Sequence, residues 1–136
     1  MDITKLPLFE VMRQRMAFLS ARQTVLAENV ANANTPGYRA KDIEEPDFAA
    51  IAAGEEGGAG VMTTTNPMHI ATPAGASAGG FRAKPTPDSE STPNGNSVVL
   101  EDQMMKVSST QMDYATVTQL YRKALSMIRM AAGGQR

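Results

Sequence analysis

The feature that most constrains the fold is a pair of heptad repeats, one near each end of the chain. The first follows Pro7, a residue suited to the opening turn of a helix. Its positions are Phe9, Met12, Met16, Leu19, Gln23, Leu26, Val30 and Ala33. Alternating spacings of three and four residues are typical of a coiled-coil seam, so we predict a helix over residues 7–33.

The second repeat lies near the C-terminus and keeps the same alternation. Its positions are Leu100, Met104, Val107, Gln111, Tyr114, Thr118, Tyr121, Leu125, Ile128 and Ala132. Asn96 or Ser97 can cap this helix at its start, and Gly133 follows its end. The repeat therefore predicts a second long helix within residues 97–136.

The two repeats complement each other when the helices run antiparallel. The predicted layers include Phe9 opposite Leu125, Met12 opposite Tyr121, and Met16 opposite Thr118. Gln23 and Gln111 then share one layer, and a buried polar pair can fix the register of two helices. We hypothesise that these glutamines set the register. The alternative is that both face solvent or neighbouring subunits.

Residues 39–96, between the repeats, have a different composition. From residue 54 onward they are rich in Gly, Pro, Ser, Thr and Ala, and their apolar residues are widely spaced: Phe48, Ile51, Val61, Met62, Ile70 and Phe81. Such a segment buries too little apolar surface to offset its ordering entropy. We expect it to be flexible and irregular, with short β pieces at most, at 61–65 or 69–70.

The predicted fold class is mainly α. Residues 1–38 and 97–136 are expected to pack as one helical domain, an antiparallel coiled-coil hairpin, with residues 39–96 as the irregular connection. Two helices bury one seam, yet apolar residues also occur on their other faces: Leu8, Val11, Val25, Leu120, Met127 and Met130. Apolar faces that the hairpin leaves uncovered predict that helices of other molecules pack on them. We therefore expect the chain to be a subunit of an assembly.

The sequence contains no recognisable catalytic or metal-binding motif. The chain has no cysteine and one histidine, His69, so it cannot supply a two-histidine metal motif. The acidic cluster at 42–47 lacks the spacing of a calcium loop, and no glycine-rich phosphate loop is present. We therefore expect no catalytic residue, metal, cofactor or small-molecule substrate.

Charge and hydropathy exclude two further classes. The net charge of −1 argues against nucleic acid as the main partner. No run of eighteen apolar residues occurs, so no membrane insertion is expected. The first residues lack a basic region followed by an apolar core, so we expect no cleaved signal peptide.

The stretch that ends the first repeat carries the most specific motif. It reads Asn29, Val30, Ala31, Asn32, Ala33, Asn34, Thr35, Pro36, Gly37 and Tyr38. Asparagine disfavours helix interiors, and Pro36-Gly37 suits a tight turn. With Val30 on the seam, Asn29 and Asn32 are left on a flank that could face another subunit. We expect their amides to bond to a neighbour or to the exit turn, with Tyr38 packing back. The alternative is a frayed helix end.

This stretch resembles the N-terminal signature of bacterial flagellar rod and hook proteins, an Asn-aliphatic-Ala-Asn-x-x-Thr-x-Gly-aromatic pattern. Its flanks, Arg22-Gln23 upstream and Arg39-Ala40-Lys41-Asp42 downstream, are similar to those of the proximal rod members. So is the later Asn94-Gly95-Asn96-x-Val98-x-Leu100-Glu101. Other members of the family usually carry larger insertions between the helices.

The resemblance implies a non-enzymatic structural subunit of the proximal rod, the drive shaft and export channel that crosses the periplasm. Such subunits are exported by the flagellar type III apparatus without signal cleavage and assemble helically through their terminal helices. The implied partners are further copies, other rod proteins, the rod-to-export-gate adaptor and the export gate. The alternative from another class is a soluble cytoplasmic coiled-coil adaptor or export chaperone. A nucleic-acid-binding helical protein would need a basic stripe.

Overall fold

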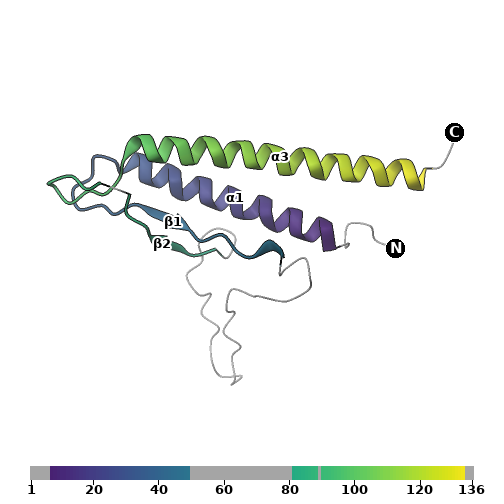
Figure 1. Cartoon of the computed structure of the whole chain (residues 1–136), viewed down its shortest axis with the longest axis horizontal. Helices are drawn as coiled ribbons and strands as arrows, with labels where there is room; N and C mark the ends of the chain where they lie inside the picture. The colour runs from purple at the N-terminus through teal and green to yellow at the C-terminus, as the bar shows by residue number, and fades with distance from the viewer. Residues whose placement is uncertain (1–6, 50–80, 89, 134–136) are drawn as a thin grey trace, which may run out of the picture.

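The computed structural model describes residues 7–49, 81–88 and 90–133, and its regular elements form three layers. In order along the chain they are α1 (Pro7–Ala31), β1 (Lys41–Ile43), β2 (Ala83–Pro85) and α3 (Leu100–Ala132). Figure 1 shows α3 on one side of α1 and the two strands on the other. The central helix is therefore covered from both sides, and the prediction of a mainly α fold is confirmed.

Helices α1 and α3 lie side by side and antiparallel (Figure 1). The ring of Phe9 meets that of Tyr121 edge to face, with 5.3 Å between centroids. Further along, the Thr118 hydroxyl lies 3.8 Å from the Met16 sulfur. The Met16–Thr118 layer is the one predicted from the repeats. Phe9 also contacts Tyr121, which the repeats placed opposite Met12 in the next layer.

Each helix ends where its sequence changes. The first ends at Ala31, and the side-chain amide of Asn32 turns back to donate to the Glu28 carbonyl at 2.8 Å. The last ends at Ala132, where the Gly133 N–H donates to the Arg129 carbonyl at 2.8 Å. The start of α3 differs from the prediction: its N-cap is Val99, without a side-chain cap, because Asn96 and Ser97 bond elsewhere.

The two short strands form an antiparallel ribbon against α1. Lys41 pairs with Pro85, Asp42 with Lys84, and Ile43 with Ala83. Their three-residue lengths carry no alternating pattern, which is why the sequence did not reveal them. The extended pieces expected at 61–65 and 69–70 lie outside the described residues, as does His69.

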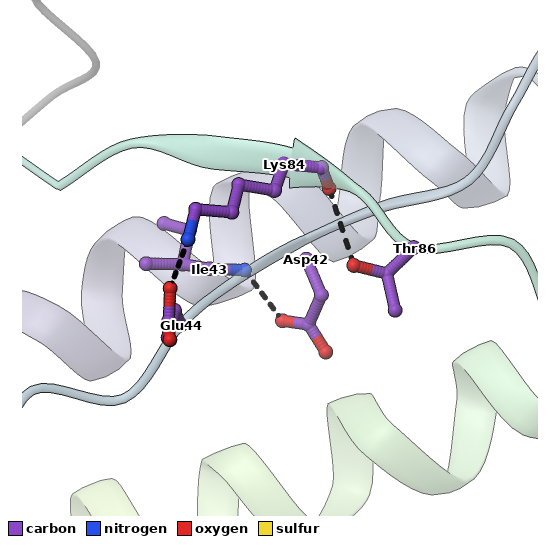
Figure 2. Close-up of a pocket in the computed structure, with 5 residues that line it drawn as sticks. All are labelled: Asp42, Ile43, Glu44, Lys84 and Thr86. Atoms are coloured by element: carbon purple, nitrogen blue, oxygen red, sulfur yellow. Dashed lines mark hydrogen bonds and ion pairs between the residues drawn. The ribbon is translucent and has the colours of Figure 1, made fainter.

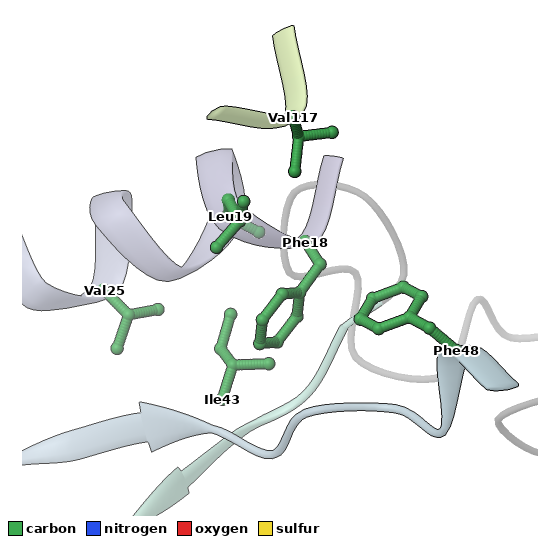
Figure 3. Packing of buried hydrophobic residues seen from close by; sticks show 7 residues of the cluster. Phe18, Leu19, Val25, Ile43, Phe48 and Val117 are labelled. Carbon is green, nitrogen blue, oxygen red and sulfur yellow. The ribbon is translucent and has the colours of Figure 1, made fainter. Parts of the chain in front are cut away.

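The main apolar core is centred on α1 and reaches both the strands and α3. It contains Phe18, Leu19, Ala21, Val25, Ile43, Phe48 and Val117. Figure 3 shows the Phe18 ring, with Phe48 beside it, directed toward the strand side of α1. The centroid of Phe18 lies 5.8 Å from that of Phe48 and 5.5 Å from that of Phe81.

The interpretation of Phe48 and Phe81 as too sparse to form a core is therefore wrong. Both rings pack edge to face on a side chain of α1, and such aromatic pairs add stability beyond the area they bury. Phe18 was not on the predicted seam, because that pattern allowed α1 only one buried face.

The buried face of α3 is also displaced from the predicted seam. It consists of Gln103, Thr110, Val117 and Ala124, spaced seven residues apart. Five predicted seam residues are exposed instead: Leu100, Met104, Gln111, Tyr114 and Ala132. The others are half-buried: Val107, Thr118, Tyr121, Leu125 and Ile128. Two of the four buried side chains are polar and one is alanine, so apolar periodicity detects little of this face.

The seam predicted on α1 is buried more fully. Phe9, Leu19 and Leu26 are buried, while Met12, Met16 and Gln23 are half-buried. The coiled-coil geometry itself stays a prediction. Neither helix in the described part of the chain combines the length and hydropathy that a bilayer-spanning segment needs.

Candidate functional site

The two motifs singled out in the sequence meet at one end of the helix pair. The signature, residues 29–38, leaves α1, and the segment 94–97 runs toward α3. Gly37 N–H donates to the Asn94 carbonyl, and Ser97 N–H donates to the Tyr38 carbonyl, each at 3.0 Å. The Ser97 hydroxyl accepts a hydrogen bond from the Ala40 N–H at 3.1 Å. We call this meeting of residues 29–41 and 94–97 the joint.

Asn29 is the centre of the joint and is fully buried. Its amide nitrogen donates to the Lys41 carbonyl at 2.7 Å and to Gln103 Oε1 at 2.9 Å. Its amide oxygen accepts from the Lys41 N–H at 3.0 Å and from the Tyr38 hydroxyl at 3.2 Å. Every hydrogen-bonding position of this amide is therefore filled.

The network continues from Asn29 through Gln103 to Asp88. Gln103 Nε2 donates to Asp88 Oδ2 at 2.8 Å, and the Val99 N–H donates to the same oxygen at 3.0 Å. Lys106 Nζ donates to Asp88 Oδ1 at 2.7 Å. Burial alone would raise the pKa of Asp88, but the bonds from Lys106, Val99 and Gln103 outweigh it and hold that pKa below its ordinary value.

Asn96 holds the turn that follows α1. Its buried amide nitrogen donates to the carbonyls of Asn32 and Ala33, each at 3.0 Å, and of Thr35 at 2.7 Å. All three carbonyls lie after Ala31, the last residue of α1. Asn96 therefore fixes the exit from the first helix, although its position in the sequence suggested a cap for the second.

Two glycines allow the two chain segments to approach. Gly37 and Gly95 both have positive φ, of 73° and 81°, a region that other residues rarely adopt. A side chain at Gly95 would lie 3.5 Å from the Gly37 Cα. The turn of the signature and the turn of the second motif are thus built against each other.

Charged side chains surround the joint in pairs. Lys41 Nζ lies 2.7 Å from Glu28 and also 5.5 Å from the centroid of the Tyr38 ring. The hydrogen bond from Lys41 lowers the pKa of Glu28, whereas burial and the Glu28 charge raise the pKa of Tyr38. These groups therefore keep their ordinary charges near neutral pH, which suits a structural joint.

A second ion pair fixes β1 to α1. Arg22 binds both carboxylate oxygens of Asp42, with Nε–Oδ1 at 2.9 Å and Nη2–Oδ2 at 2.8 Å. This two-pronged geometry is the strong form of the arginine–carboxylate interaction. The bond to Asp42 raises the pKa of Arg22 above its ordinary value.

The structure corrects two expectations, one about the signature and one about the register of the helices. Asn29 does not face another subunit, because it is buried inside this chain. The predicted Gln23–Gln111 pair is not the polar layer of the helices either, because Gln111 is exposed. The buried amide pair that links the helices is Asn29 with Gln103.

Other parts of the signature lie closer to what we expected. Tyr38 packs back, with its hydroxyl 3.2 Å from Asn29 Oδ1. Asn32 bonds within the turn, where its amide oxygen accepts from the Thr35 hydroxyl at 3.1 Å. Val30 is half-buried. Five residues of the motif are exposed: Ala31, Asn34, Thr35, Pro36 and Gly37.

Sequence reasoning missed Gln103 and Asp88 entirely. Each lies off the apolar pattern, and each acquires its role from a residue that is distant along the chain. One signal was available: Gln103, Thr110, Val117 and Ala124 recur every seven residues. A search for small and polar residues at heptad spacing would have found that face.

The two strands form a hollow whose charged side chains are already paired. A hollow of about 380 Å³ is lined by Asp42, Ile43, Glu44, Lys84 and Thr86. Figure 2 shows Lys84 directed at Glu44, while Asp42 is held by Arg22, so the charged groups of the hollow are already paired. Among the described residues, no three His, Cys, Asp or Glu side chains are grouped to hold a metal ion.

The back of α3 presents an exposed apolar surface instead. We call Met105, Met112, Leu120, Met127 and Met130 the outer stripe. Each is at least half exposed, from 50% for Met127 to 67% for Met130. At roughly 100° per residue they fall within an arc of roughly 80°, outside the arc of the buried positions. An apolar stripe of this length indicates a surface that other molecules cover.

The signature also lies within a part of the chain that matches a known family. Residues 9–39, which span most of α1 and the signature, match the family model for flagella basal body rod proteins. The class of protein is thus a structural component of the flagellar basal body, not an enzyme.

Relatives that match along most of the chain narrow the class. The chain is 32% identical over 124 residues to flagellar basal body rod protein FlgB of Agrobacterium fabrum, covering 90% of each protein. It is also 32% identical over 120 residues to FlgB of Salmonella typhimurium, covering 83% of this chain and 84% of the relative. A FlgB of Cereibacter sphaeroides is 31% identical over 124 residues, covering 90% of this chain and 91% of the relative. The chain belongs to the FlgB family of flagellar basal body rod proteins.

Proposed function

We propose that this chain is a subunit of the proximal rod that self-assembles helically through its terminal helices. The observation that carries the proposal is the outer stripe, which leaves one long face of α3 without a partner inside the described chain. Family membership supplies the setting, a basal body built from several rod proteins. In this reading the helices of neighbouring subunits cover the stripe and enclose an export channel.

The exposed members of the predicted seam belong to the same proposal. Leu100, Met104 and Tyr114 are exposed in the single chain, at 47%, 55% and 41%. Together with the outer stripe they give α3 apolar surface on more than one side. A helix in the inner layer of a rod has neighbours on several sides and needs such surfaces, whereas a helix packed on one partner needs one.

The joint has a separate role in this proposal. Its hydrogen bonds fix the angle at which the chain leaves α1 and returns to α3, so the outer layer has a defined position relative to the helices. A shaft that transmits torque requires a fixed connection of this kind. The signature thus acts within each subunit, and the helices act between subunits.

The remaining partners and the location follow from the family resemblance. At its lower end such a subunit contacts the rod-to-export-gate adaptor and the type III export gate, and at its upper end other rod proteins. It lies in the periplasm after export without a cleaved signal peptide. Nucleic acid and small molecules have no place in this arrangement.

Substitution on the outer stripe tests the proposal in cells. We expect Met112→Asp to abolish motility and rod formation in a strain lacking the wild-type copy, because it places a charge in the contact between subunits. Met112 is 64% exposed, so the purified variant should keep its helicity and unfolding midpoint. Ser108→Asp, on an exposed part of the same helix outside the stripe, is the matched control.

The same strains distinguish the alternative, a cytoplasmic adaptor or export chaperone. A rod subunit remains in basal bodies purified from the cell, whereas a chaperone stays in the cytoplasmic fraction. Normal rods in the Met112→Asp strain, or absence of the wild-type chain from purified basal bodies, would contradict the proposal.

A further inference from the structure

The outer stripe has an internal symmetry that a rod contact alone does not explain. Continuing its helical positions adds three residues, all exposed: Ser109, Thr116 and Lys123. The full stripe then reads Met105, Ser109, Met112, Thr116, Leu120, Lys123, Met127 and Met130. Thr116 lies midway between Met105 and Met127, and also midway between Met112 and Leu120.

Seven of the eight positions of the stripe therefore match when it is reversed, whereas Met130 falls opposite Asp102. If a second α3 lies antiparallel with Thr116 against Thr116, Met105 meets Met127 of the second copy and Met112 meets Leu120. The two polar positions, Ser109 and Lys123, also coincide. In a parallel pair in register, Lys123 would instead face Lys123, and two like charges would share a layer.

The charges along α3 favour the same arrangement. Its first part, residues 100–113, carries Glu101, Asp102 and Asp113, while its one lysine is already bound to Asp88. Its second part, residues 114–132, carries Arg122, Lys123 and Arg129 and no acidic residue. An antiparallel partner places the acidic part of each helix along the basic part of the other.

We propose that a second copy of this chain docks antiparallel on the outer stripe of α3, with Thr116 on the two-fold axis. This contact uses the same patch on both copies, so it closes after two chains. A rod subunit needs a contact that continues from one copy to the next. Because the pair would occupy the same stripe, a paired chain could not make that rod contact. That consequence rests on the proposed function, whereas the pairing itself does not.

Cross-linking of the purified full chain tests the pairing directly, because the chain has no cysteine of its own. We expect Thr116→Cys, treated with a short bis-maleimide, to form a covalent dimer with itself. An equimolar mixture of Met105→Cys and Met127→Cys should give several-fold more dimer than either variant alone. Gln111→Cys, exposed on another face of α3, is the control and should give little.

Three results would overturn the proposal. One is a yield of cross-linked dimer from Thr116→Cys that is no greater than the yield from Gln111→Cys. Another is Met105→Cys cross-linking to itself as well as it does to Met127→Cys, which indicates a parallel pair. The third is a mass in sedimentation that grows past two chains instead of reaching a plateau there, which indicates an open polymer.

The charge argument has its own measurement. Lys123→Glu should raise the dimer dissociation constant about tenfold, Lys123→Gln should raise it less, and added salt should weaken the wild-type pair. Lys123 is exposed, so neither variant should change the unfolding midpoint of the monomer. A dissociation constant unaffected by Lys123→Glu would contradict the pairing. These measurements use purified protein, so they stand or fall separately from rod formation in cells.

Discussion

Asn29 shows how much of this fold depends on one side chain. Its amide joins the end of α1, the backbone of β1 at Lys41, and α3 at Gln103. An amide of this size is the simplest group that offers two donors and two acceptors at one point. Aspartate has the same shape but no donor, and alanine has neither.

Substitution at Asn29 should therefore destabilise the chain in a graded way. We expect Asn29→Ala to lower the free energy of unfolding by about 2–4 kcal/mol, since it leaves buried polar groups without partners. Asn29→Asp should cost at least as much, because its carboxylate faces the Lys41 carbonyl and Gln103 Oε1. Urea unfolding followed by circular dichroism measures both. Asn34→Ala, at an exposed asparagine of the same motif, should stay within about 0.5 kcal/mol.

Asp88 gives the stability a pH dependence whose sign follows from its environment. Its pKa is lower in the folded chain than in the unfolded chain, so the unfolded chain takes up a proton first as pH falls. The stabilisation is complete above the unfolded-state pKa and is lost as pH falls through the folded-state value. Asp88→Asn should therefore be less stable near neutral pH and lose less stability between about pH 6 and pH 3.

Unfolding in urea at a series of pH values checks this expectation. Glu90→Gln, at an exposed position on the same loop, is the control and should follow the wild-type curve. A wild-type pH profile in the Asp88→Asn variant would show that the Lys106–Asp88 pair contributes nothing to the acid sensitivity.

At the scale of elements, the helices could be predicted from the sequence and their packing could not. The heptads predicted a first helix over residues 7–33, and the structure has α1 at Pro7–Ala31. The buried faces of the helices were harder to predict, because a helix that is covered on two sides has more buried positions than one seam contains. The contact of α3 through Thr110 and Ala124 carries almost no apolar signal.

The joint was visible as two motifs but not as one site. Several of its hydrogen bonds connect residues 57 to 74 positions apart, such as Ala40 with Ser97 and Asn29 with Gln103. Local propensity explains why α1 stops near Asn32, but it cannot indicate which distant side chain supplies the missing donor. Asn96 was assigned to the nearer helix for that reason.

Loss of the Asn96 side chain should loosen the turn after the other helix. We expect Asn96→Ala to speed amide exchange at residues 28–35 more than at the first turn of α3, because three carbonyls of the turn after α1 lose this donor. Hydrogen–deuterium exchange with mass spectrometry resolves the two regions. Faster exchange confined to residues 100–106 would mean that Asn96 acts as a cap for α3 after all.

At the scale of the whole molecule, the two helices differ in length, so part of α3 has no partner helix among the described residues. α1 has 25 residues and α3 has 33, and the C-terminal end of α3 extends past the start of α1 (Figure 1). The joint lies at the opposite end, where the hydrogen bonds are concentrated. Stability should therefore decrease along the molecule from the joint toward the chain ends.

Amide exchange of the dilute, unpaired chain tests this gradient. We expect residues 125–132 to exchange at least roughly tenfold faster than residues 103–117, because the end of α3 has fewer packed neighbours. Protection of the fast region should rise when other subunits pack on it. Equal protection along all of α3 in the dilute chain would show that the single molecule is uniformly stable.

The aromatic contact of Phe18 has a consequence for how such a chain can change in evolution. Phe48 and Phe81 are far apart in the sequence, yet both rings pack edge to face on this one side chain. A substitution at Phe48 or Phe81 removes one of these aromatic contacts, whereas a substitution at Phe18 removes both. Position 18 should therefore tolerate fewer exchanges than either of its partner positions.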